Sequence, residues 1–284
     1  MGSVTFLDKI INDSFNREPY VKKSWWATDL NSCLRGAFYR RKGLPPTSVI
    51  TPDRMGIMEV GKIVEGWIVD KVKQSGQLIA EQLRVEAPEY EASGKVDLIL
   101  NEGGRPVLYE IKSTNSFSFK YKMKNKEPQP QHKLQTLFYL WRLRNHGHPE
   151  ASHIDFSNLT GRLIYVSRDD LNRLIIPVDY SESTIKPVIE QLEILNSCWK
   201  KDELPPIPEP IIYDGERGKW GINWVCDFCA YHELCVGRDW RVLAEIEVKE
   251  RNGGLKHTAE NTYRKPLLKN KSLLKMHKRF FALS

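Results

Sequence analysis

Two short apolar segments with charged residues inside them constrain the fold of this chain more than any other feature. The first spans residues 94–100, Gly-Lys-Val-Asp-Leu-Ile-Leu, and the second spans residues 107–112, Val-Leu-Tyr-Glu-Ile-Lys. Their aliphatic, β-branched and aromatic content is typical of buried strands. The residues between them, 101–106, include two glycines and a proline. We therefore predict a β-hairpin.

Each predicted strand carries charge where its pattern calls for apolar residues. Asp97 lies inside the first strand, and Glu110 and Lys112 leave the same face of the second. Buried charges are costly unless they are paired or bind a metal. The two carboxylates are suitable ligands for Mg²⁺ or Mn²⁺. Lys112 could orient or deprotonate a metal-bound water, or stabilise charge on a phosphate. For these three residues alone, a surface network of salt bridges explains the pattern equally well.

A helix is predicted after the hairpin, over residues 129–145, because prolines precede it and its apolar residues have helical spacing. Gln131, Gln135 and Tyr139 recur every four residues, so they line one face of this helix. Polar residues on one helical face, directly after a charged hairpin, indicate a shared site.

At this point the sequence resembles the RecB-like branch of the PD-(D/E)xK nucleases. The motifs of that branch stand here, in order, as Gly94-x-x-Asp97, Glu110-x-Lys112 and Gln135-x-x-x-Tyr139. The resemblance implies an α/β fold with a mixed central sheet flanked by helices, like that of restriction endonucleases. It also implies that Asp97, Glu110 and the Ile111 carbonyl hold a divalent metal. By the same resemblance, Lys112 acts in the chemistry, and Gln135 and Tyr139 position either DNA or Lys112.

A fourth metal ligand is expected on an earlier helix, over residues 55–74. Its predicted core stripe consists of Ile57, Val60, Val64, Ile68 and Val72. Similar nucleases commonly have a glycine on this helix, followed four residues later by a histidine that contacts the metal. In this chain Gly61 is followed by Glu65. A carboxylate is a harder ligand than imidazole, so we expect Glu65 to favour Mg²⁺. An exposed helical glutamate is the alternative.

The remaining elements surround this core. Residues 78–87 should form a strand leading into the hairpin, and residues 161–166 and 173–178 should extend the sheet. Residues 181–201 form an amphipathic helix with Ser181 as its N-cap. Residues 113–130 are expected to be a polar, Lys-rich loop with interspersed aromatic residues. Such a loop could follow a DNA backbone and stack bases, or could simply be solvated.

Three cysteines near the C-terminal end have metal-ligand spacing, Cys226-x2-Cys229-x5-Cys235. Four-thiolate sites need one more ligand, and Cys33 is the natural choice, with Cys198 and His232 as alternatives. Zinc and iron–sulfur clusters both accept such ligands. We expect a metal site here rather than a disulfide framework.

One subgroup of RecB-like nucleases has one cysteine before the nuclease core and three after it, and these ligate a [4Fe–4S] cluster. The CRISPR-associated adaptation exonucleases and the AddB nuclease domain are of this kind, and the present chain resembles them over most of residues 30–240. The resemblance assigns Cys33, Cys226, Cys229 and Cys235 to the cluster. We expect the cluster to act as a structural staple, because it would close a long loop.

Four regions are expected along the chain. They are an N-terminal helical segment (1–50), the nuclease core (51–203), the cluster segment (204–248) and a basic extension (249–284). The extension has ten basic and two acidic residues, and could bind nucleic acid or a partner, or be a disordered tail.

The positive net charge of the chain favours an anionic binding partner. The chain has 284 residues, a formal net charge of +7 and a pI of about 9.0, which favours nucleic acid. No apolar run approaches the roughly 20 residues of a membrane span, so no membrane partner is expected. The sequence has no signal-peptide pattern, so we expect a cytoplasmic protein of prokaryotic or viral origin.

The sequence therefore predicts a divalent-metal-dependent deoxyribonuclease. By resemblance, it should be a single-stranded DNA exonuclease that can also cut overhangs. It would work beside a CRISPR integrase in spacer acquisition, or with recombination proteins in DNA repair. The alternative is a module that binds DNA or a partner without cleaving. A binding role alone does not require the full set of Asp97, Glu110 and Lys112.

Overall fold

The computed structural model describes residues 5–15, 21–48, 51–214, 218–236 and 240–253. The chain divides into two compact units. The first comprises Met1–Gly43 and Ile50–Pro205, and the second comprises Leu44–Val49 and Pro206–Ser284. The predicted basic extension falls largely on residues 254–284, which lie outside the described residues.

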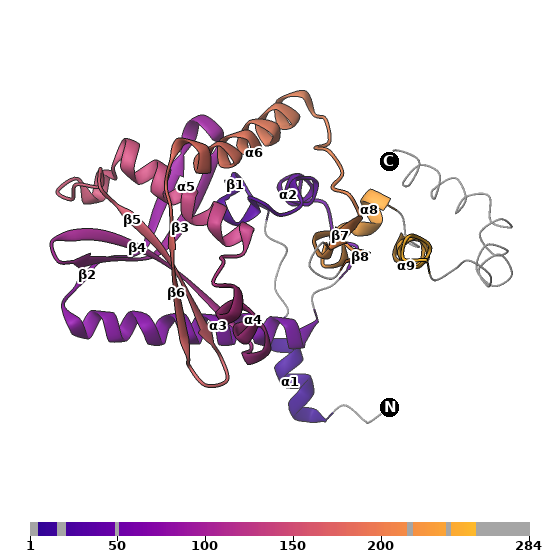
Figure 1. Ribbon diagram of the computed structural model, residues 1–284, viewed down its shortest axis with the longest axis horizontal. Helices are drawn as coiled ribbons and strands as arrows, with labels where there is room; N and C mark the ends of the chain where they lie inside the picture. The colour runs from indigo at the N-terminus through magenta and orange to yellow at the C-terminus, as the bar shows by residue number, and fades with distance from the viewer. Residues whose placement is uncertain (1–4, 16–20, 49–50, 215–217, 237–239, 254–284) are drawn as a thin grey trace, which may run out of the picture. The chain divides into compact units, whose positions relative to one another are not determined.

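The first unit is built on a six-stranded mixed sheet (Figure 1). The strand order is β1-β3-β4-β5-β6, and β2 also pairs with β3. β3 is antiparallel to β2 and to β4, whereas β4 and β5 run parallel. The strands are β1 (Trp25–Trp26), β2 (Leu78–Ala87), β3 (Ala92–Glu102), β4 (Arg105–Thr114), β5 (Thr160–Ser167) and β6 (Arg173–Val178). The expected mixed central sheet and its β3–β4 hairpin are confirmed.

Helices cover both faces of this sheet (Figure 1). On one face, α3 (Pro52–Ser75) packs Val64 and Val69 against apolar side chains of β3, β4 and β5. On the other, α5 (Pro130–His146) packs on the sheet and α6 (Glu182–Lys201) packs on α5. The parallel β4–β5 pair requires a crossover, and α4 (Ser116–Asn125) and α5 provide it. The short helices α1 (Phe6–Ser14) and α2 (Leu34–Arg41) precede α3.

Two expectations for this unit are wrong. Residues 116–125 form the helix α4 rather than a loop, because Asn115 caps its N-terminus through a hydrogen bond from the Ser118 amide. The predicted core stripe of α3 holds only from Val64 onward. Ile57 and Val60 are 51% and 42% exposed, since the sheet is covered only by the C-terminal part of this long helix.

The described residues of the second unit form a two-stranded sheet and three helices. Its elements are β7 (Ile211–Asp214), β8 (Lys219–Ile222), α7 (Trp224–Asp227), α8 (His232–Val236) and α9 (Trp240–Arg251). Ile211 and Ala244 form its buried core, with Cys226 and Cys235 packed against them. Among the described helices of the chain, none has both the length and the apolar composition needed to span a membrane.

Candidate active site

The hairpin register brings the two predicted carboxylates side by side. Leu98 on β3 faces Tyr109 on β4, so Asp97 and Glu110 are neighbours across the two strands. Both are buried, with exposed fractions of 9% for Asp97 and 1% for Glu110. Asp97 is oriented by β4, because its Oδ2 accepts a hydrogen bond of 2.8 Å from the Ile111 amide. The site therefore starts as two buried acids held in place by the sheet.

Lys112 joins the same cluster. Its Nζ lies 2.5 Å from Glu110 Oε1, and its side chain is 23% exposed. Burial alone would lower the pKa of Lys112, but the nearby Glu110 and Asp97 carboxylates outweigh this effect, so its pKa lies above the ordinary value. Lys112 is therefore a cation in this environment. It is suited to stabilise negative charge, and poorly suited to accept a proton.

Gln135 and Tyr139 on α5 form the wall behind Glu110. Gln135 Nε2 donates to Glu110 Oε1 over 2.7 Å and contacts the Tyr139 hydroxyl over 3.1 Å. These contacts place this helical face against the hairpin, where Gln135 contacts Glu110; the roles expected for Gln135 and Tyr139 in positioning DNA or Lys112 remain predictions. Gln131, one turn earlier, donates instead to the Thr28 carbonyl.

Glu110 has one carboxylate oxygen engaged and one not. Lys112 and Gln135 both donate to Oε1, whereas Oε2 is buried and has no hydrogen-bond partner within the described part of the chain. Burial, followed by the nearby Asp97 carboxylate, raises the pKa of Glu110 to about 8. A buried, unpartnered carboxylate oxygen is costly unless a cation or proton occupies it.

The packing around Gly94 explains why the motif Gly94-x-x-Asp97 begins with glycine. A Cβ atom at this position would lie 2.6 Å from Tyr139 Cε1 and 2.7 Å from its hydroxyl oxygen. Only glycine leaves room for the Tyr139 ring, which is 1% exposed. Gly94, Tyr139, Gln135 and Glu110 therefore form a continuous series of contacts from β3, through α5, to β4.

Glu65 lies close to this cluster. Burial, followed by the nearby Asp97 carboxylate, raises the pKa of Glu65 above its ordinary value, and the same burial raises that of Asp97. A residue missed by sequence reasoning connects them. Gln82 Nε2 donates to Glu65 Oε1 over 2.6 Å and lies 3.5 Å from Asp97 Oδ1. An exposed glutamine in a strand gives no sequence signal that could have identified it.

The donor set suits a hard divalent cation. Three carboxylates, Glu65, Asp97 and Glu110, come from α3, β3 and β4, and one oxygen of Glu110 accepts no hydrogen bond from the described residues. In the conformation described here, no group of three or more acidic, histidine or cysteine side chains among the described residues is arranged closely enough to ligate a metal. The predicted role of the Ile111 carbonyl remains a prediction.

The cysteines are distributed over both units. Cys33, at the N-cap of α2, is buried in the first unit, and its Sγ accepts a hydrogen bond of 3.3 Å from the Gly36 amide. Cys198 lies on α6 of the same unit. Cys226, Cys229 and Cys235 belong to the second unit, where Cys229 Sγ accepts from the Tyr231 amide over 3.4 Å. The His232 ring is hydrogen-bonded to the Cys229 carbonyl.

Comparison with known proteins gives one family match. The model of the PD-(D/E)XK nuclease superfamily matches residues 9–236, which is most of the chain. A search of curated proteins gives no match.

Several solved structures resemble the fold. The crystal structure of SSO0001 is 17% identical, with a TM-score of 0.43, and the match covers 81% of this chain and 94% of that one. The alkaline exonuclease LHK-Exo from Laribacter hongkongensis is 12% identical, with a TM-score of 0.44, covering 63% and 89%. LHK-Exo in complex with dAMP gives 13% identity and a TM-score of 0.45 over the same shares. The family match over residues 9–236, which include the whole β3–β4 hairpin and α5, shows that this chain belongs to the PD-(D/E)XK nuclease superfamily.

Proposed function

We propose that this chain is a divalent-metal-dependent deoxyribonuclease whose catalytic centre is the β3–β4 hairpin. The observation that carries the proposal is the state of Glu110. Its Oε1 is held by Lys112 and Gln135, while its buried Oε2 has no hydrogen-bond partner among the described residues and could bind a cation. A salt-bridge network with a purely structural role gives no reason for an unpartnered buried carboxylate oxygen.

In this proposal Asp97, Glu110, Glu65 and the Ile111 carbonyl hold Mg²⁺ or Mn²⁺. When bound, such an ion polarises the phosphate and lowers the pKa of water. The Ile111 amide fixes Asp97, and Gln135 and Lys112 fix Glu110, so two carboxylates are oriented before substrate arrives. Orienting these two carboxylates in advance reduces the rearrangement that the reaction requires.

Lys112 supplies positive charge. Despite burial, the nearby Glu110 and Asp97 carboxylates raise the pKa of Lys112 above its ordinary value, which favours the ammonium form. A buried ammonium group near the reacting phosphate stabilises the negative charge that develops on the phosphate oxygens. Of the roles considered for Lys112, this environment favours electrostatic stabilisation over proton abstraction.

The proposal also specifies the substrate and the pathway in which the enzyme works. The family membership and the basic composition support a nucleic-acid substrate, and the motif series supports single-stranded DNA exonuclease activity with cleavage at overhangs. A role in CRISPR spacer acquisition or in recombination and repair rests on the sequence resemblance.

A second component of the proposal is a [4Fe–4S] cluster held by Cys33, Cys226, Cys229 and Cys235. Its donor chemistry is suitable, since four thiols can supply four thiolate ligands. In each unit one of these sulfur atoms accepts a backbone amide hydrogen bond, from Gly36 and from Tyr231 respectively. Such hydrogen bonds stabilise the negative charge of thiolate ligands.

The test is digestion of end-labelled single-stranded, double-stranded and overhang substrates with Mg²⁺, Mn²⁺ or EDTA. We expect cleavage with either metal, loss of cleavage in EDTA, and loss with Asp97→Ala or Glu110→Ala while DNA binding persists. Full activity in EDTA would overturn the proposal. A wild-type protein that binds DNA and cleaves none of the substrates with either metal would favour the non-catalytic binding module.

A further inference from the structure

Gln82 has a backbone conformation that residues other than glycine rarely adopt. It lies within β2, yet its φ is +48°. Its neighbours Glu81 and Leu83 pair normally with Leu98 and Val96 on β3. Left-handed backbone for a non-glycine residue typically costs on the order of 1–3 kcal/mol and persists only where the surroundings impose it. The strand is therefore distorted at Gln82 while its register with β3 is maintained from Ala80 to Ala87.

The distorted residue lies opposite the predicted metal ligand. Because Glu81 pairs with Leu98 and Leu83 pairs with Val96, Gln82 occupies the register position across from Asp97. Its side-chain amide extends to Glu65 Oε1 on α3 and to Asp97 Oδ1 on β3. One amide group thus bridges two carboxylates that belong to different layers of the unit.

We infer that Gln82 is a positioning residue that holds Glu65 and Asp97 together as a pair of ligands. This inference rests on the proposed metal-dependent function. Two nearby carboxylates repel each other. A neutral amide donor between them offsets that repulsion without adding charge. Groups that orient metal ligands from outside typically change metal affinity by about 10- to 100-fold when removed.

Substitution by glycine tests the role of the Gln82 side-chain amide separately from that of the left-handed backbone conformation. Gln82→Gly removes the side chain, while glycine accommodates the left-handed conformation. We expect Mn²⁺ affinity, measured by calorimetry without DNA, to fall about 10- to 100-fold while the melting temperature changes little. Gln82→Asn, which keeps an amide and tolerates this conformation, should retain more affinity than Gln82→Gly. Gln77→Gly is the matched control, because it removes an exposed glutamine just before β2.

The outcomes separate this inference from the function on which it rests. If the wild type binds Mn²⁺, Asp97→Ala does not, and Gln82→Gly binds as tightly as wild type or tighter, then the inference fails and the metal site stands. Tighter binding would identify the amide as a competitor of the metal. If wild type and Asp97→Ala bind Mn²⁺ alike, the proposed metal site itself is wrong.

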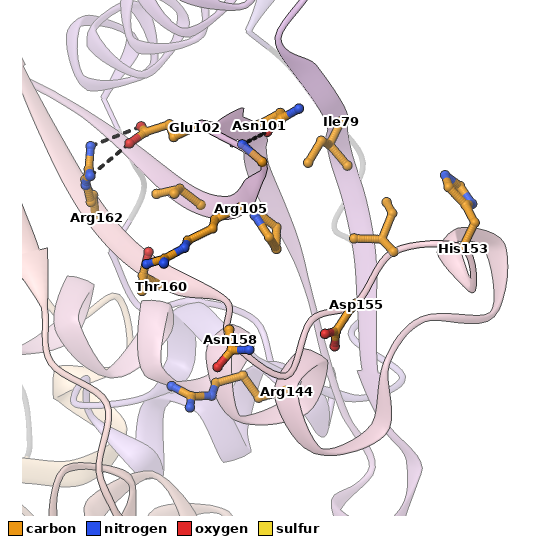
Figure 2. A pocket seen from close by; sticks show the side chains of 14 residues that line it. Ile79, Asn101, Glu102, Arg105, Arg144, His153, Asp155, Asn158, Thr160 and Arg162 are labelled. Atoms are coloured by element: carbon orange, nitrogen blue, oxygen red, sulfur yellow. Dashed lines mark hydrogen bonds and ion pairs between the residues drawn. The ribbon is translucent and has the colours of Figure 1, made fainter.

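A second inference rests on a separate feature, a cavity of about 960 Å³ at the turn of the β3–β4 hairpin (Figure 2). It is lined by side chains from both strands of the hairpin, from β5, and from the segment between α5 and β5. Arg105, Arg144 and Arg162 lie around it (Figure 2). Glu110 is five residues from Arg105 along β4, or roughly 16 Å at the rise of a strand. The cavity is therefore distinct from the proposed catalytic centre.

Two of the three guanidinium groups form no ion pair with an acid in the described part of the chain. Arg162 forms an ion pair of 2.9 Å with Glu102. Arg105 is exposed and has no ion-pair or hydrogen-bond partner among the described residues, and Arg144 stacks on Tyr180. One further acid, Asp155, lines the cavity, and it accepts a hydrogen bond from the Ser157 amide. The cavity therefore has a net positive charge, and the guanidinium groups of Arg105 and Arg144 are available as hydrogen-bond donors.

We propose that this cavity binds phosphate groups of the nucleic-acid strand outside the cleavage site. Guanidinium groups pair bidentately with phosphate oxygens, and Thr160 and Asn158 add neutral polar groups to the lining. The inference rests on the proposed nucleic-acid substrate. Its site is separate, however, and it needs no metal.

The test is oligonucleotide binding in EDTA as a function of salt. For the Arg105→Ala/Arg144→Ala double variant, the slope of log affinity against log salt should fall by about one for each phosphate contact removed, with weaker binding at all salt concentrations. Arg173→Ala, an exposed arginine on β6, is the control. An unchanged slope and affinity would overturn the inference. If inorganic phosphate or dAMP binding is lost while oligonucleotide binding is unchanged, the cavity accepts free phosphate compounds and the assignment to a strand is wrong. Metal-dependent cleavage by the double variant would leave the proposed function standing in either case.

Discussion

The hairpin site and the cysteine set differ in how the chain assembles them. Asp97, Glu110 and Lys112 lie on two adjacent strands of one unit, and the sheet register alone brings them together. The four cysteines proposed as cluster ligands are divided, one in the first unit and three in the second. The first site is a product of local backbone geometry. The second, as proposed, depends on a cofactor that joins separate parts of the chain.

This difference predicts opposite consequences of mutation. The hairpin residues are supported by strands and by α5, so removing a charged head group should remove chemistry and leave the fold. A cluster that closes a loop of about 190 residues contributes to folding, because metal binding free energy is folding free energy in such sites. Its loss should damage the whole protein rather than the reaction alone.

After the loss of cleavage expected for Asp97→Ala and Glu110→Ala, the next largest effect on rate is expected for Lys112→Ala. A positioned charge in the chemical step is typically worth about 10²–10⁴ in rate. We expect a loss in that range, with Mn²⁺ affinity and melting temperature close to wild type, measured by single-turnover cleavage, calorimetry and thermal unfolding. Lys186→Ala, an exposed lysine on α6, is the control. A change in rate below about threefold, far under that range, would make Lys112 a structural ion-pair partner.

The cysteine set is tested by Cys33→Ser with Cys198→Ser as its matched control. Anaerobically purified wild type should be brown, with a broad thiolate-to-iron absorption band and about four iron atoms per chain. Cys33→Ser should be colourless and poorly soluble, because the fold loses its staple, whereas Cys198→Ser should stay brown. Iron analysis, absorption and thermal unfolding measure these differences.

Two other results would revise the ligand set. Colourless wild type with one tightly bound zinc ion would replace the iron–sulfur assignment by a zinc site. A brown Cys33→Ser protein would show that Cys198 or His232 supplies the fourth ligand.

The proximity of the hairpin residues could be predicted from the sequence, because the pattern that indicates it is local. The charges of Asp97 and Glu110 interrupt apolar strands, and Gln135 and Tyr139 repeat at helical spacing, so each signal lies within one element. Helix α4 was missed because its lysines and aromatic residues form no apolar stripe, and its capping residue Asn115 was overlooked. Gln82 could not be found from sequence, because its role depends on a backbone distortion and on two carboxylates from other elements.

Gly94→Ala tests whether the hairpin site can also affect stability. The new methyl group would overlap Tyr139, so either the ring or β3 must move. Overpacking of this kind costs about 1–3 kcal/mol in unfolding free energy, and we expect reduced cleavage as well, because Tyr139 supports Gln135. Denaturant unfolding measures the loss. Gly66→Ala on α3, where nothing lies within 4 Å, is the control and should be neutral or stabilising.

A double variant tests whether the stability loss in Gly94→Ala arises from overlap with the Tyr139 ring. Tyr139→Leu removes the ring that occupies the space, so the cost of Gly94→Ala should be smaller in that background. Independent mutations would instead add their costs. Strict additivity of the two unfolding free energies would show that Gly94 is needed for its backbone and not for the room it leaves.

Glu65→His should have the smallest effect on cleavage activity. It also tests directly which residue sets the preference between Mg²⁺ and Mn²⁺. In similar nucleases a histidine commonly stands at this position, so imidazole should fit and activity should persist. A carboxylate is a harder ligand than imidazole, so the substitution should move the preference from Mg²⁺ toward Mn²⁺. The ratio of cleavage rates with the two ions measures this change.

Glu65→Ala should weaken metal affinity in calorimetry without altering the fold, because Glu65 is only partly buried on α3. Wild-type metal dependence of Glu65→Ala would remove Glu65 from the ligand set and leave Asp97 and Glu110 as its acidic members.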